Sequence, residues 1–133
     1  MTDLTKQAKE IFENVEGFIK NNNYKIVSVK ENYCELVGTL TETSMNTYNI
    51  AHGGYIFGLA DTAAGIAAMT DGRKAVTVDS NISFLKQGKT DSLTAIANSI
   101  KVGKTISVFE VKVYNDQKEL IAVSTITYFY ITK

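Results

Sequence analysis

The sequence contains no proline, no tryptophan, a single cysteine and a single histidine, and its formal net charge is zero. A lone cysteine, Cys34, excludes a disulfide within the chain, and its place in an expected strand indicates a buried, unreactive thiol. With 14 basic and 14 acidic residues and no basic run, the charge pattern does not favour nucleic acid as a partner. No apolar run reaches the roughly 20 residues that span a bilayer, so no membrane partner is expected either.

Other missing signals narrow the chemistry. The N-terminus lacks the apolar core of a signal peptide, which predicts a cytoplasmic protein. No Cys, His, Asp and Glu residues cluster at the spacing of metal ligands, so no metal is expected. The sequence also has no glycine-rich phosphate loop and no Gly-x-Ser-x-Gly nucleophile elbow. We therefore expect no cofactor.

The length and composition predict one domain with its own core. The chain has 133 residues, of which 44% are hydrophobic and 21% charged, as in ordinary globular proteins. We divide this single domain into an N-terminal helix within residues 1–22 and a core spanning 24–132. Thr2 or Asp3 would cap the helix, whose apolar stripe runs from Leu4 to Ile19, and the Asn run at 21–23 would end it.

Alternating apolar residues and turn signals predict about six antiparallel strands. Their expected ranges are 24–30, 33–41, 74–85, 91–102, 105–115 and 119–131. One long helix between the second and third strands then gives an α+β domain of two layers. The residues alone leave several architectures of this class open.

The expected helix is the most informative segment of the chain. Its apolar residues recur at spacings of three and four, at Tyr55, Leu59, Thr62, Ile66 and Met69. Small residues fill the rest, which allows a sheet to approach closely. Asp61 lies among them, and an acid in such surroundings is costly unless it is paired or used. It is therefore either a structural acid or a general base or nucleophile.

Two glycines, Gly53 and Gly54, fall at the start of this helix, directly after His52. Free N–H groups and the helix dipole at that end favour a developing negative charge. Gly53 and Asp61 are eight residues apart, or about 12 Å along a helix, too far for both to act on one carbonyl. If both act on one substrate, Asp61 must come from a second copy of the chain. This geometry predicts a dimer with composite sites.

These motifs together resemble a known family. His52-Gly53-Gly54, followed by Leu59-Ala60-Asp61, is similar to the hotdog-fold acyl-CoA thioesterases of the phenylacetate-pathway (PaaI-like) group, within the 4-hydroxybenzoyl-CoA thioesterase superfamily. Asn46, six residues before His52, and Thr77, in the strand after the helix, match further positions. The resemblance covers roughly residues 34–131. It departs after Phe84-Leu85, where the family often has proline and this chain has Lys86-Gln87.

The resemblance implies a hotdog fold, with the sheet wrapped around the central helix, and hydrolysis of an aryl-acetyl or medium-chain acyl-CoA. It implies that the Gly53 N–H binds the thioester oxygen and that Asp61 of the partner subunit is the base or nucleophile. His52 would orient the loop and the acyl carbonyl, Asn46 would position water or substrate, and Thr77 would lie near the acid. Gly54 and the lysines at strand ends, Lys86, Lys89 and Lys104, would contact coenzyme A. The expected assembly is a homodimer, arranged as a dimer of dimers, that needs nothing beyond the CoA of its substrate.

Each of these roles has a structural alternative. His52 and Asn46 could be plain cap and turn residues. Strict alternation would put Thr77 on one face with Asp79, Asn81 and Ser83, which indicates either a solvated face or a lining that positions water near Asp61. A non-catalytic acyl-CoA binding module of the same fold is the main alternative function. A hotdog hydratase or dehydratase is a further one, although such enzymes usually pair His and an acid in another arrangement.

Overall fold

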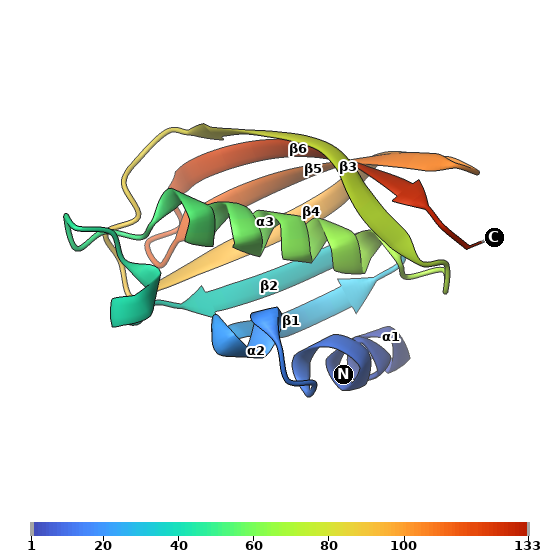
Figure 1. The fold of residues 1–133 in the computed structure, drawn as a ribbon, viewed down its shortest axis with the longest axis horizontal. Coiled ribbons are helices and arrows are strands. Elements are labelled where there is room, and N and C mark those ends of the chain that lie inside the picture. Colours follow the sequence, from blue (N-terminus) through green and yellow to red (C-terminus); the bar gives the residue numbers. More distant parts are fainter. Residues whose placement is uncertain (1, 133) are drawn as a thin grey trace.

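A six-stranded antiparallel sheet curves around one long helix in the computed structural model, which describes residues 2–132 (Figure 1). The sheet order is β1-β2-β4-β5-β6-β3. The strands are β1 (Tyr24–Lys30), β2 (Tyr33–Thr39), β3 (Ala75–Phe84), β4 (Ser92–Val102), β5 (Ile106–Asn115) and β6 (Leu120–Tyr130). The helix, α3 (Gly53–Ala68), lies across the concave face. The predicted α+β hotdog architecture is confirmed, with every strand inside its expected range.

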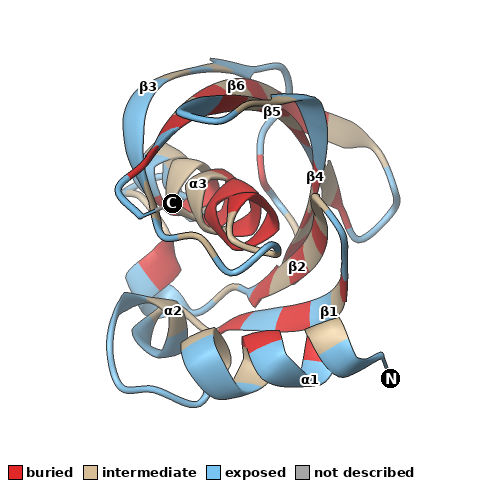
Figure 2. Ribbon diagram, turned by 90° about the vertical axis from the view of Figure 1, so that its right-hand side faces the viewer, coloured by how far each residue is buried: buried red, intermediate tan, exposed pale blue. Residues whose placement is uncertain are grey.

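Small side chains make up much of the contact between α3 and the sheet. On α3 the residues Leu59, Ala60, Ala63, Ala64 and Ala67 have no exposed surface, and Ala95 and Ala97 of β4 are equally buried. Figure 2 shows this buried face of α3 turned toward the sheet. Cys34 of β2 is also fully buried. Burial, with a smaller contribution from the charge of Glu35, raises the pKa of its thiol to about 12, which makes it a poor nucleophile.

The N-terminal segment is helical but not one helix. It forms α1 (Asp3–Ala8), a π-helical turn (Lys9–Glu13) and α2 (Phe18–Asn21), so the expectation of one continuous helix to residue 22 is wrong. The interruption at 14–17 ends at Gly17, whose φ of 149° no helical residue adopts. Thr2 caps α1, because its side chain accepts a hydrogen bond from the Thr5 N–H at 3.2 Å.

Strand β3 lies at the edge of the sheet and contains a β-bulge near its N-terminal end. Thr77 is paired with Tyr128 and Asp79 with Thr127, so Val78 is the extra residue. Neighbouring residues on β6 point to opposite faces, and therefore Thr77 faces α3 whereas Asp79 faces outward. The expectation that Thr77 shares a face with Asp79 is wrong, because the bulge reverses the alternation at Val78.

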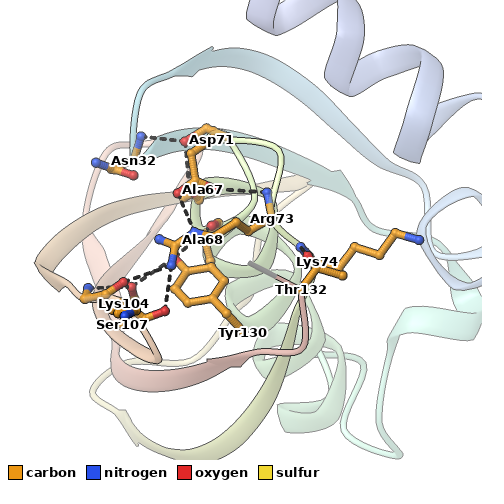
Figure 3. Close-up of polar contacts among 12 residues, drawn as sticks. Asn32, Ala67, Ala68, Asp71, Arg73, Lys74, Lys104, Ser107, Tyr130 and Thr132 are labelled. Atoms are coloured by element: carbon orange, nitrogen blue, oxygen red, sulfur yellow. Dashed lines mark hydrogen bonds and ion pairs between the residues drawn. The ribbon is translucent and has the colours of Figure 1, made fainter.

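A polar network fixes the C-terminal end of α3 to the far end of the sheet (Figure 3). The Arg73 guanidinium stacks on the Tyr130 ring at 3.5 Å from its centroid and donates to the Gly103 and Lys104 carbonyls at 3.0 and 2.9 Å. Asp71 pairs with Arg73 at 2.8 Å, and the Tyr130 hydroxyl donates to the Ala68 carbonyl at 2.9 Å. This end of the helix is therefore held by the Tyr130 side chain of β6 and, through Arg73, by backbone carbonyls of the β4–β5 turn.

Within residues 2–132, no helix combines the length and the apolar character that crossing a membrane requires.

Candidate active site

His52 begins helix α3 as its N-cap residue. Its Nδ1 accepts a hydrogen bond from the Gly54 N–H at 2.8 Å, and its carbonyl accepts from the Tyr55 and Ile56 N–H groups at 2.9 and 3.1 Å. Among residues 2–132 the Gly53 N–H finds no acceptor. The first turn therefore leaves one donor available at the positive end of the helix dipole, and it belongs to Gly53. Gly54, expected to contact coenzyme A, already uses its N–H on His52.

A pocket of about 330 Å³ is lined by Gly53 and lies between the start of α3 and the end of β3. Its walls include Ile56, Phe84 and Lys86. A Cβ atom at position 53 would lie 3.3 Å from Cζ of Phe84, so glycine keeps this pocket open at the backbone. A ligand atom can therefore approach the Gly53 N–H directly.

Two backbone contacts hold the chain as it enters α3. The Ala51 N–H donates to the Gly88 carbonyl at 3.0 Å, and the His52 N–H donates to the Ser44 carbonyl at 2.8 Å. Any Cβ at Gly88 would come within 2.8 Å of the Ala51 Cβ, so the loop after β3 packs closely on this entry. The position of Gly53 thus depends on two neighbouring loops.

Asn46 lies in the loop that precedes α3. Its Oδ1 accepts hydrogen bonds from the N–H groups of Tyr48 at 2.8 Å and Ile50 at 3.4 Å, which closes an Asx turn. Its amide nitrogen donates to no other residue within 2–132. In this structure Asn46 shapes the loop through its oxygen, and only its NH₂ group is left to meet a ligand.

Asp61 is half-buried in the middle of α3 and is held by two hydroxyl groups. Thr77 of β3 and Tyr128 of β6 both donate to its Oδ1 at 2.8 Å. The Tyr128 hydroxyl lies also 2.6 Å from the Asp61 carbonyl oxygen. Burial raises the pKa of Tyr128 far above its ordinary value, and the negative charge of Asp61 raises it further, so this hydroxyl stays protonated as a donor. Both bonds go to Oδ1, which leaves Oδ2 without a hydrogen-bond partner among the described residues.

A second groove, of about 270 Å³, opens beside Asp61. It lies between α3, the first half of β3 and the N-terminal segment, and most of its lining is apolar. It shares no lining residue with the pocket at Gly53. One chain thus separates the N–H donor from the carboxylate, which lie eight residues and about 12 Å apart on the helix.

The three expected CoA-binding lysines are divided between the two ends of the molecule. Lys86 lines the pocket at Gly53 and forms an ion pair with Glu119, whose carboxyl pKa is lowered by that hydrogen bond. Lys89 is exposed three residues further along the same loop. Lys104 lies in the β4–β5 turn, where Arg73 binds its carbonyl beyond the other end of α3. Of these three lysines, Lys86 is the one that lines the pocket at Gly53.

Tyr128 is the site residue that the sequence did not indicate. It is one of seven tyrosines, and it is 2% exposed in a strand of alternating buried residues. Only the pairing of Tyr128 with Thr77 places its hydroxyl over Asp61. A register prediction for β3 and β6 could have found it, but a single sequence carries no signal for the bulge that sets this register.

No group of three or more His, Cys, Asp and Glu side chains that could hold a metal ion occurs in the part of the chain the structure describes.

Comparisons with known proteins agree with this fold. A sequence profile of the thioesterase superfamily matches residues 48–122. The acyl-coenzyme A thioesterase PaaI of Escherichia coli K12 is 32% identical over 118 residues, which cover 88% of this chain and 84% of that protein. The structure of E. coli PaaI superposes with a TM-score of 0.90 and 28% identity, covering 96% of this chain and 94% of that one. Smu.793 of Streptococcus mutans UA159, bound to acetyl-CoA, gives 0.83 and 32%, covering 92% and 97%.

Proposed function

The chain belongs to the thioesterase superfamily, and we propose that it hydrolyses acyl-CoA thioesters in a site shared between two copies of the chain. One observation carries this proposal. The carboxylate of Asp61 is held by two neutral hydroxyls through Oδ1, and no basic side chain of residues 2–132 pairs with it. Buried structural acids are usually paired with a basic side chain. Asp61 instead lies beside a mostly apolar groove, with Oδ2 unpaired among the described residues.

The exposed edge of the sheet supports the shared site. Strand β3 has no neighbour on its outer side, and Val76 and Val78 are 44% and 56% exposed there. Antiparallel pairing of two β3 strands about a two-fold axis near Asn81 would set Thr77 of one chain opposite Phe84 of the partner subunit. Since Thr77 contacts Asp61 and Phe84 borders Gly53, this pairing brings the two halves of the site together.

The chemistry follows from these two halves. The thioester oxygen accepts a hydrogen bond from the Gly53 N–H, so the negative charge that develops on it is stabilised by the helix start. Oδ2 of Asp61 from the partner subunit then either takes a proton from the attacking water or attacks the carbonyl carbon itself and forms an anhydride that water cleaves. In both routes the C–S bond breaks, and CoA leaves as the thiol. Label that enters the Asp61 carboxylate during turnover in ¹⁸O-labelled water identifies the anhydride route, in which water attacks the Asp61 carbonyl carbon of the anhydride.

The substrate class is an acyl-CoA with an aryl-acetyl or medium-chain acyl group. E. coli PaaI is an acyl-CoA thioesterase, and Smu.793 binds acetyl-CoA. In this chain Lys86 lines the pocket at Gly53, and Lys89 is exposed three residues further along the same loop, where both can meet the phosphates of coenzyme A. Lys104 reaches the same coenzyme only if the partner subunit brings that turn near. A cytoplasmic location and a dimer of dimers complete the proposal.

Thiol release from a panel of acyl-CoAs tests the proposal directly. The panel runs from acetyl- through octanoyl- to phenylacetyl- and benzoyl-CoA, and the variant is Asp61→Asn. We expect wild type to cleave at least one thioester and Asp61→Asn to lose about 10²–10⁴-fold in kcat, the usual contribution of a positioned base. Asp79→Asn is the matched control, because Asp79 faces outward on the other side of the bulge. If wild type binds the panel and cleaves none of it, the protein is an acyl-CoA binding module instead.

Mixing two inactive variants tests the shared site. Asp61→Asn and Gly53→Ala are unfolded and refolded together, so that copies associate at random. A shared site leaves one intact site in each mixed dimer, and about a quarter of wild-type activity should return. If each chain holds a complete site, the mixture stays as inactive as its parents.

A further inference from the structure

A further cavity, of about 100 Å³, adjoins the groove at Asp61 and lies under helix α1. It is lined by residues of α1, of the π-helical turn and of the end of α3, among them Leu4, Ala8 and Thr70. Phe12, Ile66 and Met69 line both this cavity and the groove at Asp61. Ile66 and Met69 belong to α3 and its C-cap, so Phe12 is the one shared wall residue that the N-terminal segment contributes.

Phe12 is held in this position from both sides. The Glu13 side chain accepts a hydrogen bond from the Ile26 N–H of β1 at 2.6 Å. Thr5 Oγ1 accepts from the Val29 N–H of the same strand at 3.0 Å. The π-helical turn at Lys9–Glu13 lies between these two anchors and carries Phe12, half-buried, onto the core. Single π-helical turns are rare and concentrate at functional positions.

We propose that Phe12 sets the maximum length of the acyl group that the enzyme accepts. This proposal rests on the proposed function, since it takes the groove at Asp61 as the place where the acyl chain lies. With Phe12 in place, the acyl group has the 270 Å³ groove and stops at the aromatic ring. Removal of the ring would join the groove to the 100 Å³ cavity behind it. Phe12 is thus a specificity-determining residue that lies outside the catalytic helix and the sheet.

The test compares chain-length profiles of four proteins: wild type, Phe12→Ala, Phe12→Trp and Phe18→Ala. Phe18→Ala is the matched control, because it removes the same ring from the same segment at a position that does not line the groove at Asp61. kcat/KM is measured for saturated acyl-CoAs from hexanoyl to hexadecanoyl. Dissociation constants are measured in parallel for acyl-CoA thioethers, in which a CH₂ group replaces the thioester carbonyl.

We expect Phe12→Ala to raise the ratio of kcat/KM for dodecanoyl- over octanoyl-CoA about tenfold or more, since each added methylene in an apolar pocket changes discrimination by at least that order. Phe12→Trp should lower the same ratio, and Phe18→Ala should leave it unchanged. The thioether affinities should shift in the same sense.

An unchanged ratio in both Phe12→Ala and Phe12→Trp overturns the proposal, and so does an equal shift in Phe18→Ala. Phe12→Trp keeps the test decisive if Phe12→Ala folds poorly. If wild type cleaves no thioester, the proposed function fails, but the thioether affinities still decide whether Phe12 limits chain length.

Discussion

At the C-terminal end of helix α3 the last carbonyl groups all accept hydrogen bonds, whereas at the N-terminal end the Gly53 N–H has no acceptor among residues 2–132. The paired carbonyls are those of Ile66, Ala67, Ala68 and Met69. Side chains of Thr70 and Tyr130 supply two of these donors. In the first turn, by contrast, His52 satisfies the three N–H groups that follow Gly53 and leaves that of Gly53 free.

This difference separates stability from chemistry along one helix. A fully paired helix end adds stability, because no polar group is left unsatisfied on folding. A helix start with one free donor gives up part of that stability and keeps a positive partial charge available for a ligand. The two ends, about 23 Å apart along 16 residues, should therefore respond in opposite ways to substitution.

Among the substitutions that test this difference, the largest effect should come from Gly53→Ala, at the N-terminal end of α3. The added methyl would lie 3.3 Å from Phe84 and narrow the approach to the N–H donor. We expect kcat/KM to fall about 10²-fold, the scale of losing one oxyanion donor, while the melting temperature stays equal or rises because alanine favours helix. Steady-state kinetics and thermal unfolding by circular dichroism measure both. A protein that loses stability and activity together would contradict the separation.

Arg73→Ala is the reciprocal experiment at the paired end. It removes the stack on Tyr130 and the bonds to the Gly103 and Lys104 carbonyls. We expect the free energy of unfolding to fall by about 2 kcal/mol, with kcat/KM unchanged well below the melting transition. Arg73→Lys should recover little, because an ammonium group cannot stack and bridge two carbonyls as the planar guanidinium does. Denaturant titration measures the stability and steady-state kinetics the activity. A loss of activity without a loss of stability would contradict the separation of the two along the helix.

Tyr128→Phe tests whether contacts in the middle of α3 affect activity, as expected for the N-terminal end, or stability, as expected for the C-terminal end. Without its hydroxyl, Asp61 keeps only Thr77 as a donor to Oδ1. A positioning role for Tyr128 predicts that kcat falls about tenfold with KM unchanged, the mark of an interaction that matters in the transition state. Thr77→Val should act likewise, and the double variant should lose less than the two single losses combined. If only the melting temperature changes, Tyr128 serves the fold alone.

His52→Ala should have the smallest effect of these substitutions. It tests how much the N-cap at the start of α3 contributes to stability. It removes the cap on the Gly54 N–H and should destabilise the protein by about 1 kcal/mol. His52→Asn should restore most of this loss, because asparagine is among the best N-cap residues. Thermal melts of both variants measure it. An Asn variant that melts like the Ala variant would show that the imidazole has a role beyond capping.

How far the sequence could predict this structure depends on how local each feature is. The hairpin turn at Glu31-Asn32 was predictable, because Asn32 adopts a φ of 57° that asparagine tolerates well. The start of α3 at Gly53 followed from His52 and the periodicity after it. These features depend on residues a few positions apart. The predicted roles of the site residues stay predictions.

The features that sequence reasoning missed depend on contacts between distant segments. The break at 14–17 accompanies the bond from Ile26 to Glu13, which no helical pattern signals. The position of Tyr128 over Asp61 required the register of β3 on β6. Phe12 belonged to a regular apolar stripe, and only the fold shows that it stands between two cavities.

The bulge at Val78 adds one residue to strand β3 and so shifts which of its side chains face the helix. In a regular strand, residues two positions apart point to the same face, but two such residues on either side of the bulge point to opposite faces. Thr77 therefore faces Asp61, whereas Asp79 does not. An insertion or deletion elsewhere in the strand would therefore exchange the residue beside the acid without any substitution there. A single insertion or deletion in β3 can thus give the Asp61 carboxylate a new neighbour in one step.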